Sequence, residues 1–370
     1  MRDIYYVCCK IALFWNSRII FNMIKKYIHI GYPKNFSTSL QCDFFAKHPQ
    51  LFHLGIGPQL LYCDAITDAT FEVYLKSAKR FKYAEVEERL KKHFSGLFKK
   101  AQESGKKAVT VSSEHLSFAF SNDALGFEEK IGRLAELMGS GTKIIAIIRN
   151  QFDLIKSLYR ESVRVGFPGD FSLYIYLLYK YQDRNYYYDF RYDLAHDVLC
   201  KYFEPEDIHF FVFEHMRNAK GELIETNGEV NLLRSLCDLL EVDYLKTDFG
   251  HYNEALENST IIAKAGLNKI RRHDLGNMQL ETAEKHRMKH YLFDELKLHE
   301  EESFLYSDVI TKRALIEEAK KHEYHSGEKI NYQGDSDIIC RIKQFYEEGN
   351  YKLSLRTGLV LPDNYFNLGF

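Results

Sequence analysis

Lys25-Lys-Tyr-Ile-His-Ile-Gly-Tyr-Pro-Lys-Asn-Phe-Ser-Thr-Ser39 is the segment that decides the fold of this chain. Its apolar run at residues 27–30 predicts a short buried strand. Residues 37–48 then carry Leu40, Phe44 and Phe45 at helical spacing, on one face. A strand, a polar loop and a helix in this order are the entry to an α/β fold.

The same alternation of strands and helices continues to about residue 245. Residues 143–148 (Lys-Ile-Ile-Ala-Ile-Ile) are apolar on both faces, as the central strands of parallel sheets are. The sequence therefore predicts an α/β fold with a parallel β-sheet flanked by helices and an additional helical C-terminal region. Further strands are predicted at 107–112 and 207–213, and helices at 71–104, 127–138, 151–165 and 230–240.

Four segments are expected along the chain. Residues 1–22 are interpreted as an N-terminal extension that is poorly ordered or not native, with Met23 as the alternative start. Residues 23–254 form the predicted α/β core. Residues 255–335 are rich in charge and helical in pattern, which predicts a helical subdomain or insertion. Residues 336–370, with a helix predicted at 338–348, are expected to pack back on the core.

Composition excludes several classes of protein. The 370 residues are 45% hydrophobic and 28% charged, which is ordinary for a globular protein, and the formal net charge of −2 gives no reason to expect a nucleic-acid partner. The seven cysteines are odd in number and form no Cys-x-x-Cys, so a disulfide framework or zinc ribbon is not expected. The 15 histidines show no metal-ligand spacing, so no metal is expected.

Scattered free thiols suit a reducing compartment, and a cytoplasmic location is therefore expected. The apolar stretch at residues 5–23 is interrupted by Lys10, Asn16, Ser17 and Arg18. Because a spanning helix needs about 20 mostly apolar residues, stable membrane insertion is not expected. A membrane anchor formed by residues 1–22 is the alternative. The sequence gives no indication of the oligomeric state.

The loop between the first strand and its helix has the composition of an anion site. Backbone N–H groups and the positive end of the helix dipole favour a phosphate there. A P-loop NTPase needs Gly-x-x-x-x-Gly-Lys-Ser/Thr. In this chain Lys34 precedes the hydroxyl residues Ser37 and Thr38 instead of adjoining them, and the second glycine is missing. A Gly-x-Gly-x-x-Gly fingerprint is absent too, which weakens the case for kinases and dehydrogenases.

Two motifs resemble the donor-binding elements of PAPS-dependent sulfotransferases, which have a P-loop fold and use 3′-phosphoadenosine 5′-phosphosulfate (PAPS). Tyr32-Pro-Lys-Asn-Phe-Ser-Thr38 resembles the 5′-phosphosulfate loop, commonly Tyr-Pro-Lys-Ser-Gly-Thr-Thr. Arg149-Asn-Gln-Phe-Asp153, with Ser157 eight residues after the arginine, resembles the 3′-phosphate element. The resemblance covers residues 25–245 and 338–362 and is nearest to the bacterial and carbohydrate sulfotransferases.

This resemblance implies a donor site for PAPS, with PAP as the product and no metal required. Lys34 would sit at the oxygen that leaves the sulfur, and Arg149 would hold the 3′-phosphate. Phe36 stands where the family usually has glycine, so either the loop takes another path or the donor sits differently. The implied donor contacts are Pro33, Lys34, Asn35, Phe36, Ser37, Thr38, Ser39, Arg149, Ser157, Lys352 and Arg356.

The acceptor group needs a general base. Glu114 is the first candidate, because it follows a predicted strand and would lie at the carboxyl edge of the sheet, where ligands bind in open α/β folds. His115 is its neighbour. In carbohydrate-type relatives a glutamate soon after a His-Pro pair acts as base, and His53 is the suitable side chain in that stretch of this sequence.

The sequence thus predicts an enzyme that moves a sulfuryl group from PAPS to a hydroxyl or amine of a small-molecule or glycan acceptor, with a carbohydrate or glycolipid favoured. One alternative is a P-loop nucleotide or sugar kinase. A second is a non-catalytic nucleotide-binding relative, which the departure at Phe36 supports.

Overall fold

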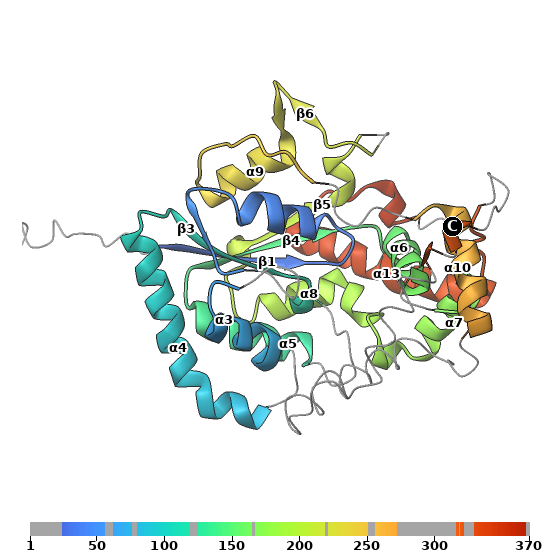
Figure 1. The fold of residues 1–370 in the computed structure, drawn as a ribbon, viewed down its shortest axis with the longest axis horizontal. Helices are drawn as coiled ribbons and strands as arrows, with labels where there is room; N and C mark the ends of the chain where they lie inside the picture. The colour runs from blue at the N-terminus through green and yellow to red at the C-terminus, as the bar shows by residue number, and fades with distance from the viewer. Residues whose placement is uncertain are drawn as a thin grey trace, which may run out of the picture.

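A five-stranded parallel β-sheet forms the centre of the computed structural model (Figure 1). Its strands are β1 (Lys25–Gly31), β2 (Leu51–His53), β3 (Ala108–Ser113), β4 (Thr142–Ile148) and β5 (Ile208–Val212), in the spatial order β2-β3-β1-β4-β5. The predicted α/β class with a parallel sheet is confirmed. The structure describes residues 24–55, 62–75, 80–117, 125–164, 167–218, 221–250, 256–271, 316–317, 319–321 and 329–367.

Strand β1 lies in the middle of the sheet and is buried from Tyr27 to Gly31. Its residue Ile28 pairs with Val111 on β3 and with Ile144 on β4. The chain leaves β1 toward β2 on one side, and it later crosses to β4 on the other side. Because all strands are parallel, the loops that follow β1, β3 and β4 emerge at one edge. Such a reversal of strand order is where open α/β sheets bind ligands.

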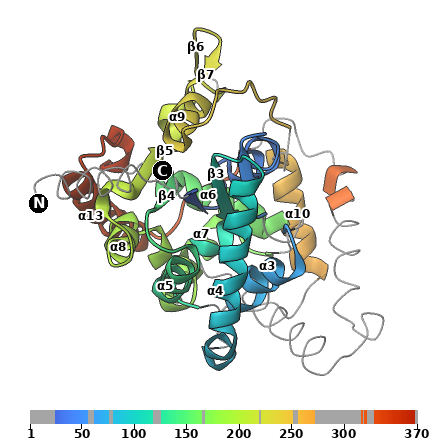
Figure 2. The ribbon, with the colours of Figure 1, turned by 90° about the vertical axis from the view of Figure 1, so that its left-hand side faces the viewer.

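One face of the sheet is covered by the helix that follows β1 and by α9 (Asn231–Leu240). The first of these helices begins as α2 (Ser37–Ser39) and continues as a π-helical segment, Leu40–Phe45. Leu40 and Phe44 pack with Leu236 of α9 against Ile147 of the sheet. Burying one such aliphatic or aromatic side chain contributes about 1.5–3 kcal/mol. Figure 2 shows α9 on this side of the sheet, with the hairpin β6 (Glu225–Thr226) and β7 (Glu229–Val230) above it.

The opposite face is covered by a second group of helices, as Figures 1 and 2 both show. These helices are α3 (Ala65–Ala69), α4 (Arg80–Glu103), α5 (Phe127–Met138) and α8 (Tyr192–Leu199). The strand residues Ile28, Val109 and Ile144 point to this side, and Leu134 of α5 packs against them. Apolar residues on both faces of β1 and β4 explain why these strands were recognisable as buried.

A third apolar cluster accounts for much of the high aromatic content. It joins α6 (Gln151–Arg164), α7 (Phe171–Lys180), α10 (Asn258–Arg271) and α13 (Ser336–Thr357), which lie together in Figure 1. Edge-to-face ring pairs are common in it, which is the preferred arrangement of aromatic rings. The fully or nearly buried rings include Tyr159, Phe167, Phe171, Tyr174, Tyr186, Tyr187, Phe190, Tyr192, Tyr346 and Tyr365.

Several elements differ from the sequence prediction. The edge strand β2, the hairpin and the helices α7 and α8 were not predicted, and the helix predicted at 338–348 extends over the whole of α13. The helix predicted at 37–48 is π-helical over Leu40–Phe45 and ends there. The extension predicted at 1–22 lies outside the described residues. Of the helical region predicted at 255–335, the structure describes 256–271, 316–317, 319–321 and 329–335.

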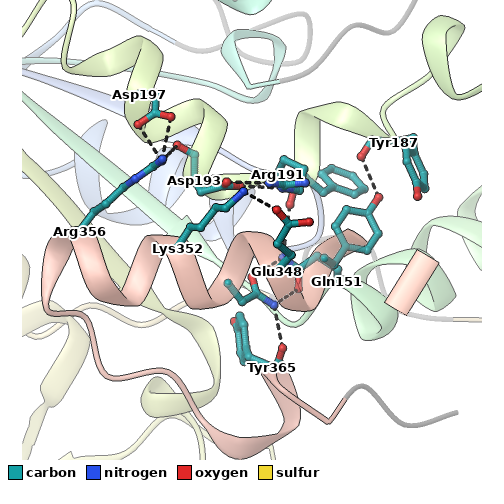
Figure 3. Close-up of polar contacts among 12 residues, drawn as sticks. Gln151, Tyr187, Arg191, Asp193, Asp197, Glu348, Lys352, Arg356 and Tyr365 are labelled. Atoms are coloured by element: carbon teal, nitrogen blue, oxygen red, sulfur yellow. Dashed lines mark hydrogen bonds and ion pairs between the residues drawn. The ribbon is translucent and has the colours of Figure 1, made fainter. Parts of the chain in front are cut away.

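Helix α13 approaches α8 very closely at Gly349. A buried ion pair lies at this point, with Arg191 Nε 2.7 Å from Asp193 Oδ1 and Arg191 Nη2 2.8 Å from Oδ2 (Figure 3). The next residue, Asn350, exchanges two amide hydrogen bonds with Gln151 at the start of α6, of 2.7 and 3.0 Å. The glycine is what allows the two helices to meet around these buried polar groups.

Gly349→Ala is therefore expected to destabilise the protein. The added Cβ would collide with Arg191 Nε and would lie 2.7 Å from Asp193 Oδ1, which forces the buried ion pair apart. Overpacking of this kind costs about 1–3 kcal/mol. The matched control is Gly96→Ala in α4, where a Cβ meets no atom within 4 Å. That change should stabilise the helix by about 0.5–1 kcal/mol. Urea midpoints of the two variants should move in opposite directions, and equal shifts would contradict the packing described.

A polar layer lies inside the face that carries the π-helical segment. His29 Nδ1 is 2.7 Å from Ser112 Oγ, and His53 Nδ1 is 2.9 Å from Thr110 Oγ1. The ring of Phe45 covers both imidazoles, at centroid distances of 5.4 and 5.7 Å. Burial lowers the pKa of His29 to about 3 and that of His53 to about 4, and the proximity of His53 also lowers the value for His29. Both histidines are thus neutral in the folded protein at ordinary pH.

This layer predicts a loss of stability in mild acid. The folded pKa values lie below the unfolded value of about 6.5, so below that pH the unfolded chain binds more protons and stability falls as the pH falls. Between pH 7 and pH 5.5 the loss should be about 1 kcal/mol for each histidine. Urea unfolding measured over this range should show a weaker pH dependence in His29→Asn than in the wild type. An identical slope in the two proteins would rule out His29 as a source of the effect.

Candidate active site

The loop after β1 contains two residues in a left-handed backbone conformation. Lys34 has a φ of 61° and Phe36 a φ of 67°. This conformation costs a non-glycine residue about 1–2 kcal/mol. Such strain persists only where the surroundings hold it, and it is concentrated at ligand sites. Phe36, which stands where glycine was expected, therefore adopts a conformation that glycine would take without steric cost.

Three hydrogen bonds hold this loop in place. Asn35 Nδ2 donates to the carbonyl of Ile147 at the end of β4 (2.8 Å), and Ser37 Oγ donates to the carbonyl of Tyr32 (2.9 Å). Ser117 Oγ, beyond β3, donates to the carbonyl of Gly31 (2.8 Å). The loop is thus fixed to both neighbours of β1, which explains how the strained conformations are maintained.

Gly31 brings the loop into contact with Glu114, which follows β3. A Cβ on Gly31 would lie 2.9 Å from Ser37 Oγ and 3.3 Å from Glu114 Cγ, so only glycine fits without displacing them. Glu114 begins a short 3-10 helix, Glu114–Leu116, directly at the carboxyl end of its strand. The sequence-predicted base and the sequence-predicted anion loop are therefore neighbours in the fold.

The motif that begins at Arg149 contacts the loop that contains Lys34. Arg149 follows β4, and its Nη1 donates to the carbonyl of Lys34 over 3.1 Å. The backbone carbonyl of Arg149 accepts from the hydroxyl of Tyr192 (2.8 Å). Asn150 caps the helix that follows, because its Oδ1 accepts from the backbone N–H groups of Phe152 and Asp153. Two segments more than 110 residues apart thus bring their cationic side chains to the same edge of the sheet.

Lys34 pairs with one carboxylate and acts electrostatically on a second. Its Nζ is 3.0 Å from Glu161 Oε2 on α6, and both side chains are largely buried. Burial raises the pKa of Glu114 to about 7, Lys34 and a hydrogen bond from Ser37 oppose this rise, and the charge of Glu161 adds to it. A carboxyl group with a pKa near neutrality can accept a proton at ordinary pH, as a general base must.

A stack of aromatic rings and guanidinium groups lies beside the loop. Arg149 and Arg217 each lie 4.9 Å from the ring centre of Phe213, and Arg217 lies 5.5 Å from that of Phe36. Phe36 in turn packs edge-on against Phe249 at 4.7 Å. Cation–π contacts of this kind orient a guanidinium without neutralising its charge.

The two arginines of this stack keep their positive charge uncompensated. Within the part of the chain that the structure describes, neither guanidinium pairs with a carboxylate, and Arg217 Nε is buried without a hydrogen-bond partner. Burial and the charge of Arg149 both lower the pKa of Arg217. Two like charges held together in this way favour a bound anion, and arginine is well suited to a phosphate.

Arg217 was not found from the sequence. It stands three residues after Glu214, in the loop that follows β5. Its position after a predicted strand could have indicated it, because the loop after every parallel strand emerges at the same edge of the sheet. Glu161 was missed as well, although it lies one helical turn after Ser157 and therefore on the same side of α6.

The remaining donor residues predicted from the sequence lie close to these groups in the chain. Pro33 is buried within the loop, and the side chain of Asn35 is committed to the carbonyl of Ile147. Thr38 is partly exposed and Ser39 is buried, both in the first turn of the helix.

Four other predicted residues make their recorded contacts elsewhere. Lys352 pairs with Glu348 in its own helix, and Arg356 pairs with Asp197 on α8, 2.7 Å away (Figure 3). His53 pairs with Thr110 inside the sheet. The carbonyl of His115 accepts a hydrogen bond from Lys130 of α5. In these contacts Lys352, Arg356 and His53 are engaged by their own parts of the fold, and their roles at the site stay predictions.

Clusters of metal ligands and membrane-spanning helices are both absent from the described residues. These residues contain no group of three or more His, Cys, Asp or Glu side chains that could hold a metal ion. No helix among the described residues is long and apolar enough to cross a membrane.

Comparison with known proteins gives a likeness to solved structures and no match to a known sequence. No protein-family model matches the chain, and no curated protein sequence matches it. Among solved structures, the crystal structure of a sulfotransferase from Alicyclobacillus acidocaldarius is similar over 68% of this chain and 97% of that chain. The sequence identity is 15% and the TM-score is 0.36. A sequence identity and a TM-score this low carry no conclusion about function.

Proposed function

We propose that this chain is a sulfotransferase that moves a sulfuryl group from PAPS to a hydroxyl or amine acceptor, with a carbohydrate or glycolipid as the favoured class. The observation that supports this most directly is the hydrogen bond from Arg149 to the carbonyl of Lys34. It links two cationic motifs, each of which resembles a donor-binding element, beside a carboxyl group with a pKa near 7.

PAPS is anionic at two places, and the site offers cations in two places. Lys34 and the hydroxyl groups at the start of the helix would hold the 5′-phosphosulfate, and Lys34 would stabilise the negative charge that grows on the leaving oxygen. Arg149 and Ser157 would hold the 3′-phosphate. We add Arg217 to this second group, because it shares the ring of Phe213 with Arg149.

Transfer of a sulfuryl group resembles phosphoryl transfer, in which the planar group passes in line between two oxygens. A bond forms from the acceptor oxygen or nitrogen to sulfur while the bond from sulfur to the 5′-phosphate oxygen breaks, and PAP leaves. Glu114 would take the proton of the acceptor. The protein contributes position and charge, which are the main sources of catalysis in such reactions.

Two other functions remain candidates, each with its own observation. A P-loop nucleotide or sugar kinase would also use a lysine at a strand–loop–helix junction, but it would favour ATP over PAP. A non-catalytic nucleotide-binding relative is supported by the ion pair that engages Lys34 and by the departure at Phe36. Both alternatives can be separated from the proposal by nucleotide binding followed by an acceptor screen with labelled PAPS.

Donor binding should depend on the paired arginines. By calorimetry, the wild type should bind PAP more tightly than AMP or ATP, because only PAP carries the 3′-phosphate. Arg217→Ala should weaken PAP binding about tenfold or more, while AMP binding should change little. Arg149→Ala should weaken binding of both nucleotides, and that of PAP more strongly, because it also removes the hydrogen bond to the carbonyl of Lys34. The matched control is Arg234→Ala, which removes an arginine that pairs with Glu229 at α9. Absence of any heat at millimolar PAP would refute the sulfotransferase proposal, and tighter binding of ATP would favour the kinase.

Transfer activity should depend on the ionisation of Glu114. Because its pKa is raised to about 7, the active carboxylate form is lost as the pH falls through that value. With an acceptor found by the screen, kcat/KM of the wild type should rise with pH up to about 7 and then level off. Glu114→Gln should remove most of the activity and the acidic limb of the profile, with PAP binding retained. If the variant keeps full activity, Glu114 is not the base, and His115 and His53 should be tested next.

A further inference from the structure

The carboxylate of Glu161 forms an ion pair with Lys34, the residue that the proposed function assigns to binding the donor. Glu161 Oε2 lies 3.0 Å from Lys34 Nζ, and the two side chains are only 28% and 27% exposed. Its other oxygen, Oε1, accepts from Arg164 Nε over 3.0 Å and also pairs with Arg164 Nη2. The Glu161 carboxylate is therefore held by two cations from opposite sides, one on the loop and one on its own helix.

This ion pair and a bound phosphosulfate would compete. Both are anions that seek the ammonium group of Lys34, and a partly buried charge pair is screened little by salt. A donor anion that reaches Lys34 also meets the negative charge of Glu161, and like charges in a partly buried site repel. Arg164 can keep Glu161 paired when Lys34 leaves it, because its contact does not involve the loop.

Glu161 also acts on the second carboxyl group of the site. The titratable groups that face Glu114 are Lys34 of the loop, whose charge lowers its pKa, and Glu161 of α6, whose charge raises it. Lys34 pairs with Glu161 and its charge also acts on Glu114, so a change at one of the two glutamates affects the other through Lys34. On the same grounds, Lys34 and Arg164 lower the pKa of Glu161, so that it carries its charge at neutral pH despite its burial.

We propose that Glu161 is an internal competitor for the donor: it holds Lys34 when the donor site is empty and yields it to the phosphosulfate on binding. This inference rests on the proposed function and adds a positioning residue to it. It explains why a carboxylate with two cationic partners lies inside a site that otherwise suits anions.

The first test is the affinity for PAP of Glu161→Gln, measured by calorimetry on the full chain. Removing the competing charge while keeping the shape should lower the Kd about fivefold or more. The matched control is Glu229→Gln, which removes a carboxylate that pairs with Arg234 away from the loop and should leave the Kd unchanged. If the wild type binds PAP and Glu161→Gln binds it equally or more weakly, Glu161 is not a competitor. If the wild type binds no PAP, the proposed function fails and the competitor role fails with it.

The second test needs no nucleotide and reads Glu114 directly. The carboxyl carbon of Glu114 can be followed by NMR in protein labelled with ¹³C at glutamate Cδ, and it is assigned by its loss in Glu114→Gln. Its titration midpoint should fall in Glu161→Gln, because a negative neighbour is removed, and should stay near the wild-type value in Glu161→Asp, which keeps the charge. A midpoint that is unchanged in Glu161→Gln would overturn the effect on Glu114. A purely structural role of Glu161 would alter the glutamine and aspartate variants alike.

Discussion

The hydrogen bond from Arg149 to the carbonyl of Lys34 is the contact on which the rest of the site depends. It joins the loops that follow β1 and β4, the two strands at the centre of the sheet. Because these strands are parallel and adjacent, their loops emerge at the same edge of the sheet. The pairing of the strands by itself therefore brings Arg149 close to Lys34. It also helps to hold Lys34 in a left-handed conformation that the isolated loop would avoid.

The balance of charge around this contact sets the chemistry. Lys34 pairs with Glu161 and its charge acts on Glu114, whereas Arg149 and Arg217 both lie against the ring of Phe213. The part of the site around Lys34 thus has nearly balanced charges. The part around Arg149 and Arg217 carries two positive charges without a paired carboxylate among the described residues. This division suits a ligand with a reactive anionic end and a second anionic end that serves only for recognition. The near-neutral pKa of Glu114 follows from burial, which Lys34 and Ser37 oppose and to which the charge of Glu161 adds.

The C-terminal segment forms hydrogen bonds with the loops at the same edge of the sheet. Tyr365 donates its hydroxyl to Glu214 Oε2, and the other oxygen of Glu214 accepts from the backbone N–H of Asn150. Asn150 in turn donates its side-chain amide to the carbonyl of Asn364. These bonds fix the start of α6, directly after Arg149, from a segment more than 200 residues later in the chain. Buried polar networks of this kind define one geometry, because leaving any member unpaired is costly.

The sequence by itself determined the class of fold and the core of the site. The apolar strands, the polar loop and the order of the two motifs are local patterns, and the rule that parallel strands end at one edge placed Lys34, Arg149 and Glu114 together. Only the tertiary structure decided which charged groups pair. It brought Arg217 and Glu161 to the loop, and it left Lys352 and Arg356 on α13 in ion pairs with other partners. The physical reason is that periodicity and turn chemistry act over a few residues, whereas an ion pair depends on distances between segments that only the packed fold fixes.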